Sequence, residues 1–269
     1  MSTRRITLLG LTAFGAACVL AAAAAAASIT PPPSIKKAGK IVYCSDITYP
    51  PEEFYQGSKP IGSDIEIGTD IARRMGAKAV FKNTTFDSII ASLLAKKCDA
   101  IISGMNDTAE RRKAVDFVDY ILVGQSFMVR KGNPGHISTV SSLAGKRVSV
   151  ESGTTNRDFL AAESKKLVKR GKKAITIVTF PKDTDAVAAL SAGRVDAYFG
   201  DSPVVAYYIA RYPAFAFGGT PVNPIPVGIA IRKGDPLKDA VQKAVTVMYA
   251  DGTMKQILSR WKMADFALK

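Results

Sequence analysis

Charged and polar side chains follow several apolar runs of the chain, and their types suit a dipolar ligand. A zwitterion requires a cation and oriented N–H groups for its carboxylate, and an anion for its ammonium. In the segment 107–111, Asp107 or Thr108 can cap a helix whose first turn carries Arg111. Asp201 comes directly after a buried apolar run. We expect Arg111 to bind the carboxylate and Asp201 to bind the ammonium of one small ligand.

Both residues also have an ordinary structural interpretation. Arg111 could be a surface helix arginine like its neighbour Arg112, and Asp201 could merely cap a helix that starts at Pro203.

Further polar and aromatic candidates lie at similar places. Thr154 and Thr155 follow a glycine at a strand-to-helix passage, where their hydroxyl and N–H groups can bind an anion. Asp46 and Tyr49 follow the first apolar run and lead into two prolines, a rigid turn that would hold them at a cleft mouth. Phe86 opens a helix and offers an aromatic face. Helix capping and core packing are the competing roles for the threonines and for Phe86.

Strand-like runs alternate with helix-periodic segments, which predicts an α/β fold with mostly parallel sheets. The expected strands are 41–45, 79–82, 100–103, 147–150, 175–180, 197–199 and 227–232. The expected helices are 65–75, 86–95, 156–169, 185–192 and 236–250.

Two segments, 91–100 and 188–197, resemble each other, and each reads as a helix end, a turn, Asp-Ala and a strand. Polar residues follow both strands, at the carboxyl ends where open α/β sheets bind ligands. Any helix-to-strand unit could look alike by chance, but a duplication would give two similar lobes with a cleft between them.

The composition limits the function classes. The 269 residues are 47% hydrophobic and carry a formal net charge of +14, or +12 without residues 1–27. The Lys and Arg residues are scattered, so we expect no nucleic-acid partner. His136 is the single histidine and lies in a turn-like context. The residues therefore offer neither a histidine-based metal site nor a Ser/His/Asp triad, and we expect no cofactor and no metal.

The N-terminus has the pattern of a secretory signal. Two arginines precede an apolar run, and an alanine tract ends at Ala27, which predicts a signal peptide over residues 1–27. A retained anchor or lipidation at Cys18 are the alternatives. No later stretch reaches the roughly 20 apolar residues of a membrane span. Of the remaining cysteines, Cys44 lies late in one expected strand and Cys98 just before another. We expect two buried thiols, because neighbouring strands would hold them too far apart to bridge.

The order and spacing of several motifs resemble bacterial extracellular solute-binding protein family 3, the periplasmic amino-acid receptors. The resemblance covers residues 39–261. Its motifs are Asp46-Ile-Thr-Tyr-Pro-Pro51, Gly62-Ser-Asp-Ile-Glu66, Phe86-Asp-Ser-Ile-Ile90, Asp99-Ala-Ile-Ile-Ser-Gly-Met105, Thr108-Ala-Glu-Arg111, Leu143-Ala-Gly-Lys-Arg-Val148, Ser152-Gly-Thr-Thr155, Gly193-Arg-Val-Asp-Ala197 and Ala250-Asp-Gly-Thr253.

The resemblance implies a two-lobed periplasmic binding protein of type II, with mostly parallel sheets flanked by helices and two hinge strands. Lobe 1 would comprise residues 36–124 and 225–269, and lobe 2 residues 125–224. Arg111 would bind the ligand carboxylate with Thr154 and the backbone of Ser103 to Met105, including Gly104, while Asp201 would bind the α-ammonium. Asp46, Tyr49 and Phe86 would surround the side chain.

Two departures from the family pattern concern the side-chain pocket. Glu52 stands where the family often has Phe, and Ser63 where it usually has Phe. If Glu52 faces the pocket, it and Asp46 would favour a cationic amino acid such as lysine, arginine, ornithine or histidine. If it does not, a polar neutral amino acid is the alternative.

The expected function is binding of an amino acid, without catalysis, by a monomer that delivers it to an ABC permease in the inner membrane. An enzyme resembling a periplasmic dehydratase, or a sensor for a membrane receptor, are the alternatives.

Overall fold

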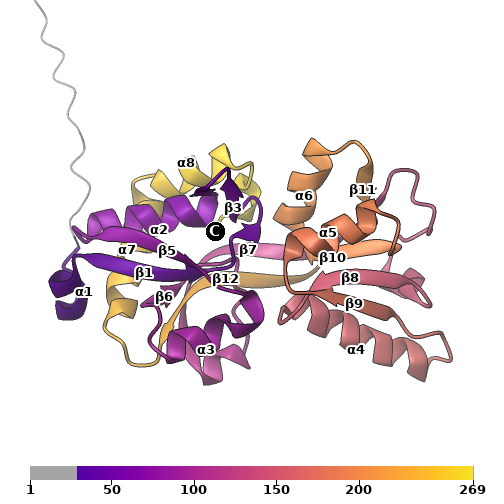
Figure 1. Cartoon of the computed structure of the whole chain (residues 1–269), viewed down its shortest axis with the longest axis horizontal. Coiled ribbons are helices and arrows are strands. Elements are labelled where there is room, and N and C mark those ends of the chain that lie inside the picture. Colours follow the sequence, from indigo (N-terminus) through magenta and orange to yellow (C-terminus); the bar gives the residue numbers. More distant parts are fainter. Residues whose placement is uncertain (1–28, 269) are drawn as a thin grey trace, which may run out of the picture.

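The computed structural model describes residues 29–268, which form two groups of helices and strands (Figure 1). The predicted signal peptide and Cys18 lie outside these residues. None of the helices within 29–268 combines the length and the apolar character that crossing a membrane requires.

The first group comes from both ends of the described chain. It contains α1 (Pro33–Ala38), β1 (Lys40–Ser45), β2 (Thr48–Tyr49), β3 (Glu53–Gln56), β4 (Lys59–Ile61), α2 (Ser63–Arg74), β5 (Lys78–Asn83), η1 (Phe86–Ser88), α3 (Ile89–Leu94), β6 (Ala100–Ile101), η2 (Arg111–Lys113), α7 (Leu237–Ala250), α8 (Thr253–Arg260) and η4 (Ala264–Phe266).

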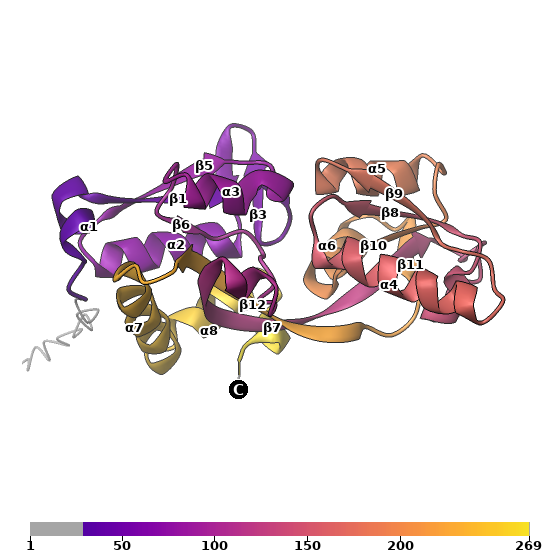
Figure 2. The ribbon, with the colours of Figure 1, turned by 90° about the horizontal axis from the view of Figure 1, so that it is seen from below.

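The second group contains η3 (Val140–Leu143), β8 (Arg147–Glu151), α4 (Thr155–Lys169), β9 (Thr176–Phe180), α5 (Asp183–Ser191), β10 (Ala197–Asp201), α6 (Ser202–Arg211) and β11 (Phe215–Phe217). Two long strands, β7 (Val115–Arg130) and β12 (Val222–Arg232), run from one group to the other (Figure 2). We refer to the two groups as lobe 1 and lobe 2.

One sheet continues through both lobes in the order β5-β1-β6-β12-β7-β10-β8-β9, and β11 also pairs with β7. The pairs β1/β5 and β1/β6 are parallel in lobe 1, as are β10/β8 and β8/β9 in lobe 2, while β7 and β12 pair antiparallel. The predicted α/β, two-lobed architecture with parallel strands and helices is confirmed.

Apolar residues at helical spacing fix the helices to this sheet. In α2, Ile67 and Ile71 are fully buried one turn apart, and in α7, Val241 and Val245 repeat the pattern. Both helices pack into the lobe 1 core, whereas Leu160 of α4 packs into a separate lobe 2 core. Burying each such side chain contributes about 1.5–3 kcal/mol before the entropy cost of ordering it.

Most expected elements match the structure within a few residues, but some differ. The helix predicted to follow Asp107 is only the 3₁₀ turn η2, because β7 begins at Val115, two residues after η2 ends. The sheet β2-β3-β4 and helix α8 were not predicted. The expected strand 227–232 is the second half of β12. The lobe boundaries at residues 124 and 225 remain a prediction.

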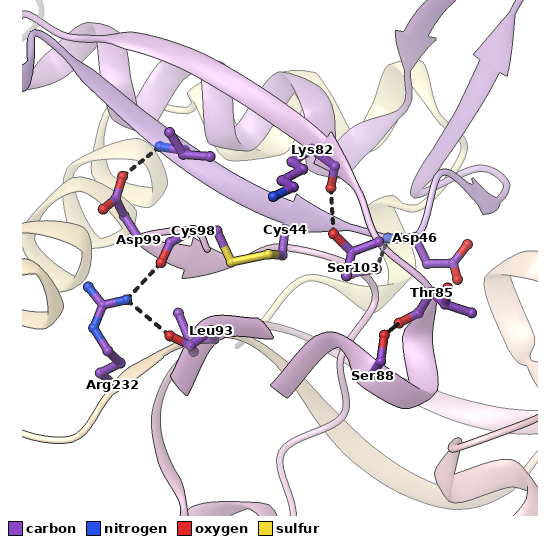
Figure 3. The surroundings of a disulfide bond; sticks show 12 residues. Cys44, Asp46, Lys82, Thr85, Ser88, Leu93, Cys98, Asp99, Ser103 and Arg232 are labelled. Carbon is purple, nitrogen blue, oxygen red and sulfur yellow. Dashed lines mark hydrogen bonds between the residues drawn. A yellow bond between two sulfur atoms is a disulfide. The ribbon is translucent and has the colours of Figure 1, made fainter. Parts of the chain in front are cut away.

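The prediction of two free thiols is wrong. Cys44 and Cys98 form a disulfide, with their Cα atoms 5.7 Å apart (Figure 3). Strand pairing places Cys44 opposite Ile101, which suggested a long separation. The chain, however, turns back after α3 at Lys96, whose φ is 57°, so Cys98 precedes the strand and lies over the face on which α3 packs. Both cysteines belong to the core cluster on that face.

Candidate functional site

A small enclosed cavity lies between the lobes, where the strand ends of both halves meet. It is lined by Tyr49, Phe86, Gly104, Asn106, Glu151, Thr154, Asn156 and Asp201. Five of these residues were predicted from the sequence: Tyr49, Phe86, Gly104, Thr154 and Asp201. Asp46, Glu52, Ser103, Met105, Arg111 and Thr155 do not line the cavity itself.

Asp201 ends β10 and is 1% exposed. Asn156 Nδ2 donates to Asp201 Oδ1 and Asn106 Nδ2 donates to Oδ2, both at 3.2 Å. The backbone N–H of Asp201 donates to the Tyr49 hydroxyl. Burial raises the pKa of Asp201 to about 6, against the lowering effects of these hydrogen bonds and of the Arg111 charge. The carboxylate makes no capping hydrogen bond to α6, so the alternative role as a helix cap does not hold.

Arg111 stands beside the cavity at the contact of the two lobes. Its Nη1 donates to the Asn106 carbonyl at 2.8 Å, and its Nη2 donates to the Gly153 carbonyl of lobe 2 at 3.2 Å. The guanidinium carbon lies 5.3 Å from the centre of the Phe86 ring. Arg112 instead pairs with Asp107 on the outside of lobe 1. The two adjacent arginines therefore differ, and only Arg111 faces the cleft.

The N-terminus of α4 approaches the same place from lobe 2. The Thr154 hydroxyl accepts from the Arg157 N–H at 3.2 Å, which confirms the predicted N-cap, and it donates to the Glu151 carbonyl. The Thr155 hydroxyl donates to Asn106 Oδ1 across the cleft. Thr154 thus offers the cavity a capped helix end, while the hydroxyl of Thr155 is used to join the lobes.

Asp46 and Ser103 are buried supports of the cavity wall. Asp46 Oδ2 accepts from the Phe86 N–H and Oδ1 accepts from the Thr48 hydroxyl. The Ser103 hydroxyl accepts from the Asp46 N–H and donates to Glu53 Oε1. Burial raises the pKa of Asp46. These bonds hold Phe86 in place, and the side chains of Asp46 and Ser103 find their partners within lobe 1.

Glu52 is 1% exposed and is not among the residues that line the cavity. Its Oε2 has no hydrogen-bond partner, and burial raises its pKa well above the usual range, with Asp64 and Asp201 adding to the shift. The role of Glu52 in favouring a cationic ligand stays a prediction. Met105 points away from the cavity, because its side chain packs in the core beside the disulfide.

Three lining residues were missed: Asn106, Glu151 and Asn156. All are buried, and each lies within one residue of a segment that sequence reasoning had singled out. A signal was present, since Asn106 and Glu151 belong to the polar stretches that follow two apolar runs. Asn156 lies in the first turn of α4, directly after the two predicted threonines.

The two lobes are in contact across this cavity. The Asp183 N–H of lobe 2 donates to the Thr48 hydroxyl of lobe 1, and a Cβ on Gly153 would lie 2.6 Å from the Asp87 Cα. At the cleft mouth, the Phe54 ring contacts Tyr207 of lobe 2 at 5.5 Å and Trp261 of lobe 1 at 5.8 Å, both edge-on. The structure is a closed form.

Larger hollows lie on the outer surface. One of about 610 Å³ runs between α2 and α8. Among the described residues that line this hollow, none has a buried side-chain polar atom without a hydrogen-bond partner. The small cavity, in contrast, is lined by two such atoms, Glu151 Oε1 and Asn156 Oδ1. Among residues 29–268, no group of three or more His, Cys, Asp or Glu side chains is arranged to hold a metal ion.

The model of the bacterial extracellular solute-binding proteins, family 3, matches residues 41–264. The chain belongs to this family.

Two similar proteins are binding proteins named for different ligands. The L-cystine-binding protein TcyJ of Escherichia coli is 30% identical, covering 86% of this chain and 85% of its own. The histidine-binding periplasmic protein of Salmonella typhimurium is 32% identical, with 82% and 87% covered.

Two solved structures of amino-acid-binding proteins are similar to this chain in sequence and in fold. A mutant of the arginine-binding protein ArgBP from T. maritima is 33% identical, with a TM-score of 0.78 and coverage of 85% of this chain and 97% of that one. An ancestral amino acid-binding protein, AncCDT-1, described as a precursor of cyclohexadienyl dehydratase, has the same identity, TM-score and coverage.

Proposed function

We propose that this family 3 protein is the extracytoplasmic binding component of an ABC transporter and binds one amino acid between its lobes. The observation that carries the proposal is the closed cavity, where a buried acid from lobe 2, Asp201, lies near the lobe 1 cation, Arg111. The α-ammonium would lie on Asp201. The α-carboxylate would take the Arg111 guanidinium and the N-terminus of α4, capped by Thr154.

Closure is coupled to binding by charge. In the closed form, Glu151, Asp183 and Asp201 are nearly fully buried, which is costly for ionised carboxylates without cations. Without ligand this cost favours opening about β7 and β12. A bound ammonium compensates it, so the ligand shifts the population toward the closed form that a permease would recognise.

In this proposal the protein is a monomer located outside the cytoplasm, and it releases the bound amino acid to a membrane permease. The names of the relatives describe binding proteins, and one of them carries the word periplasmic. A receptor sensor would use the same closure. Neighbouring genes for a permease and an ATPase would distinguish transport from sensing.

Catalysis on the same fold is the second candidate, because AncCDT-1 is described as a precursor of a dehydratase. The buried acids Glu151 and Asp183 have raised pKa values, but we assign them to binding, and turnover of arogenate or prephenate would contradict this.

A thermal-shift screen against the twenty amino acids and ornithine tests the function, because a ligand that binds only the native form raises the melting temperature. Calorimetry of Asp201→Ala and Arg111→Ala with the best ligand should show a loss of about 3–5 kcal/mol in each case. Unchanged affinity in both variants would remove the two residues from the site. The absence of any stabilising amino acid would reject the function.

A further inference from the structure

The two lobes place an acid at the same position of the same substructure. Pairing sets Tyr43 beside Ala100 in lobe 1 and Val148 beside Ala197 in lobe 2. Counting three residues onward from Tyr43 and from Val148 gives Asp46 and Glu151. Asp46 therefore lies just beyond the end of β1, and Glu151 is the last residue of the equivalent strand β8.

The hydrogen bonding of these two acids differs. Both oxygens of Asp46 accept hydrogen bonds from lobe 1 groups, the Phe86 N–H and the Thr48 hydroxyl. Glu151 lines the cavity, is 3% exposed, and its Oε1 has no partner. An unpaired buried carboxylate oxygen is costly, so it indicates a missing donor. Because Glu151 lines the enclosed space, the ligand is the group positioned to supply that donor.

The charges around the cavity are unbalanced. Within residues 29–268, the two charged residues that line the cavity, Glu151 and Asp201, are both acids, and no Lys or Arg lines it. The second acceptor without a partner, Asn156 Oδ1, lines the same space. A neutral amino acid brings one ammonium and one carboxylate, so it would leave one of the two buried carboxylates without a counter-ion.

The two carboxylates have different surroundings. Asp201 is influenced by the Arg111 charge and bonds to Asn106, so it lies with the groups proposed for the ligand backbone. Glu151 ends β8, the neighbouring strand, and the charges that raise its pKa most are those of Asp183 and Asp46, after burial itself. Adjacent strands lie about 4.8 Å apart, which leaves room for separate cationic groups at the two acids.

We propose that Glu151 is the specificity-determining residue, whose carboxylate binds a cationic amino-acid side chain while Asp201 binds the α-ammonium of the same molecule. This inference rests on the proposed function and adds the ligand class to it. The ring of Phe86 lines the space beside Glu151 and provides an apolar face for the aliphatic part of such a side chain.

Arginine and citrulline provide the sharpest test, because they differ mainly in the charge at the end of the side chain. Calorimetry would measure both ligands on the full chain, on Glu151→Gln and on a matched control, Glu163→Gln, whose side chain pairs with Lys166 on α4 away from the cavity. We expect the wild type and the control to bind arginine at least about 30-fold more tightly than citrulline.

In Glu151→Gln, arginine affinity should fall by about 30-fold or more, while citrulline affinity stays within about threefold. A melting temperature close to that of the wild type would show that the variant is folded. Equal binding of citrulline and arginine by the wild type, or a preference for arginine that survives in Glu151→Gln, would overturn the role of Glu151 and leave the binding function intact. If the wild type bound no amino acid in the thermal-shift screen, the function itself would fail.

Discussion

A connection from the end of a helix to a sheet strand occurs once in each lobe, at residues 93–100 and 190–197. We call this connection the corner, and the two copies are stabilised differently. In lobe 1 an arginine of β12, Arg232, donates to the Leu93 and Cys98 carbonyls (Figure 3). In lobe 2 an arginine of β7, Arg130, donates to the Leu190 and Val195 carbonyls.

The turn and the following aspartate also repeat. Lys96 and Gly193 both have positive φ, and the carboxylates of Asp99 and Asp196 both accept a backbone N–H from the neighbouring strand. The structure thereby supports the weak sequence repeat as a repeated unit.

The difference lies in the covalent link. Lobe 1 has the Cys44–Cys98 disulfide, and the equivalent positions of lobe 2 hold Ser149 and Val195. Ser149 donates to the Ala186 carbonyl instead. Since the corner forms without a disulfide in lobe 2, the disulfide is not what shapes it. Its contribution is stability, mainly by restricting the unfolded chain.

Removing the disulfide should give the largest effect. The double variant Cys44→Ser with Cys98→Ala opens a loop of 54 residues, for which the chain-entropy relation gives about 4 kcal/mol. Chemical denaturation should show this loss in the free energy of unfolding. A loss below about 1 kcal/mol would mean that the two corners are equally stable without the link.

Replacing the two arginines should sharpen the comparison. Arg130→Met leaves two carbonyl groups without a charged donor and should cost about 2 kcal/mol. Arg232→Met should cost less, because the disulfide still fixes Cys98. In the cysteine-free background the two costs should become equal, and denaturation of all variants would measure this. Additive costs in every background would contradict the shared role of the disulfide and Arg232.

The lobes also differ four residues after the equivalent positions Ala100 and Ala197. Lobe 1 has Gly104 there, whereas lobe 2 has the acid Asp201. The pKa of Asp201 is raised to about 6, so its carboxylate is ionised above that pH and neutral below it. Affinity for an ammonium ligand should therefore fall about tenfold between pH 7 and pH 5.

The raised pKa values of Glu151 and Asp183 act in the same direction. In Asp201→Asn the pH dependence should be weaker, and calorimetry at both pH values would show it. For stability the sign is opposite: the raised pKa of Asp201 stabilises the ligand-free closed form at low pH, and this contribution is lost as pH rises from about 4 to 6. An affinity that rises on acidification would contradict the account.

The smallest effect is expected at the aromatic contact between the lobes. Tyr207→Ala removes the edge-on contact with Phe54, worth about 1 kcal/mol, only in the closed form. Ligand affinity should weaken about fivefold, while the loss of the contacts of Tyr207 with Tyr208 and Arg211 inside lobe 2 affects the open and closed forms alike. Tyr212→Ala, on the same side of lobe 2, removes only contacts within that lobe and should leave affinity unchanged. Equal effects of both substitutions would exclude a role in closure.

Much of the fold was predictable, because alternation of apolar strands and amphipathic helices is a local property of the sequence. Five of the eight lining residues were also named, since each ends a strand or begins a helix. Asp201 is an example, as it directly follows a buried run. The resemblance to the family added the hinge strands and the backbone of Ser103 to Met105 as partners of the ligand carboxylate.

What could not be predicted depends on tertiary geometry. The disulfide was missed because strand register alone does not show that Cys98 lies over the face of β1. The burial of Glu52 depends on the sheet β2-β3-β4 around it, which has no strong local pattern. Glu151 was overlooked because its lack of a partner is visible only once every neighbour is placed.

A crystal structure of the protein with the amino acid that gives the largest thermal shift tests the central claim most directly. We expect one molecule in the cavity between the lobes, with its α-ammonium nitrogen about 3 Å from the Asp201 carboxylate and its carboxylate on Arg111. A ligand bound in the outer hollow between α2 and α8, or one whose α-ammonium does not contact Asp201, would contradict the account.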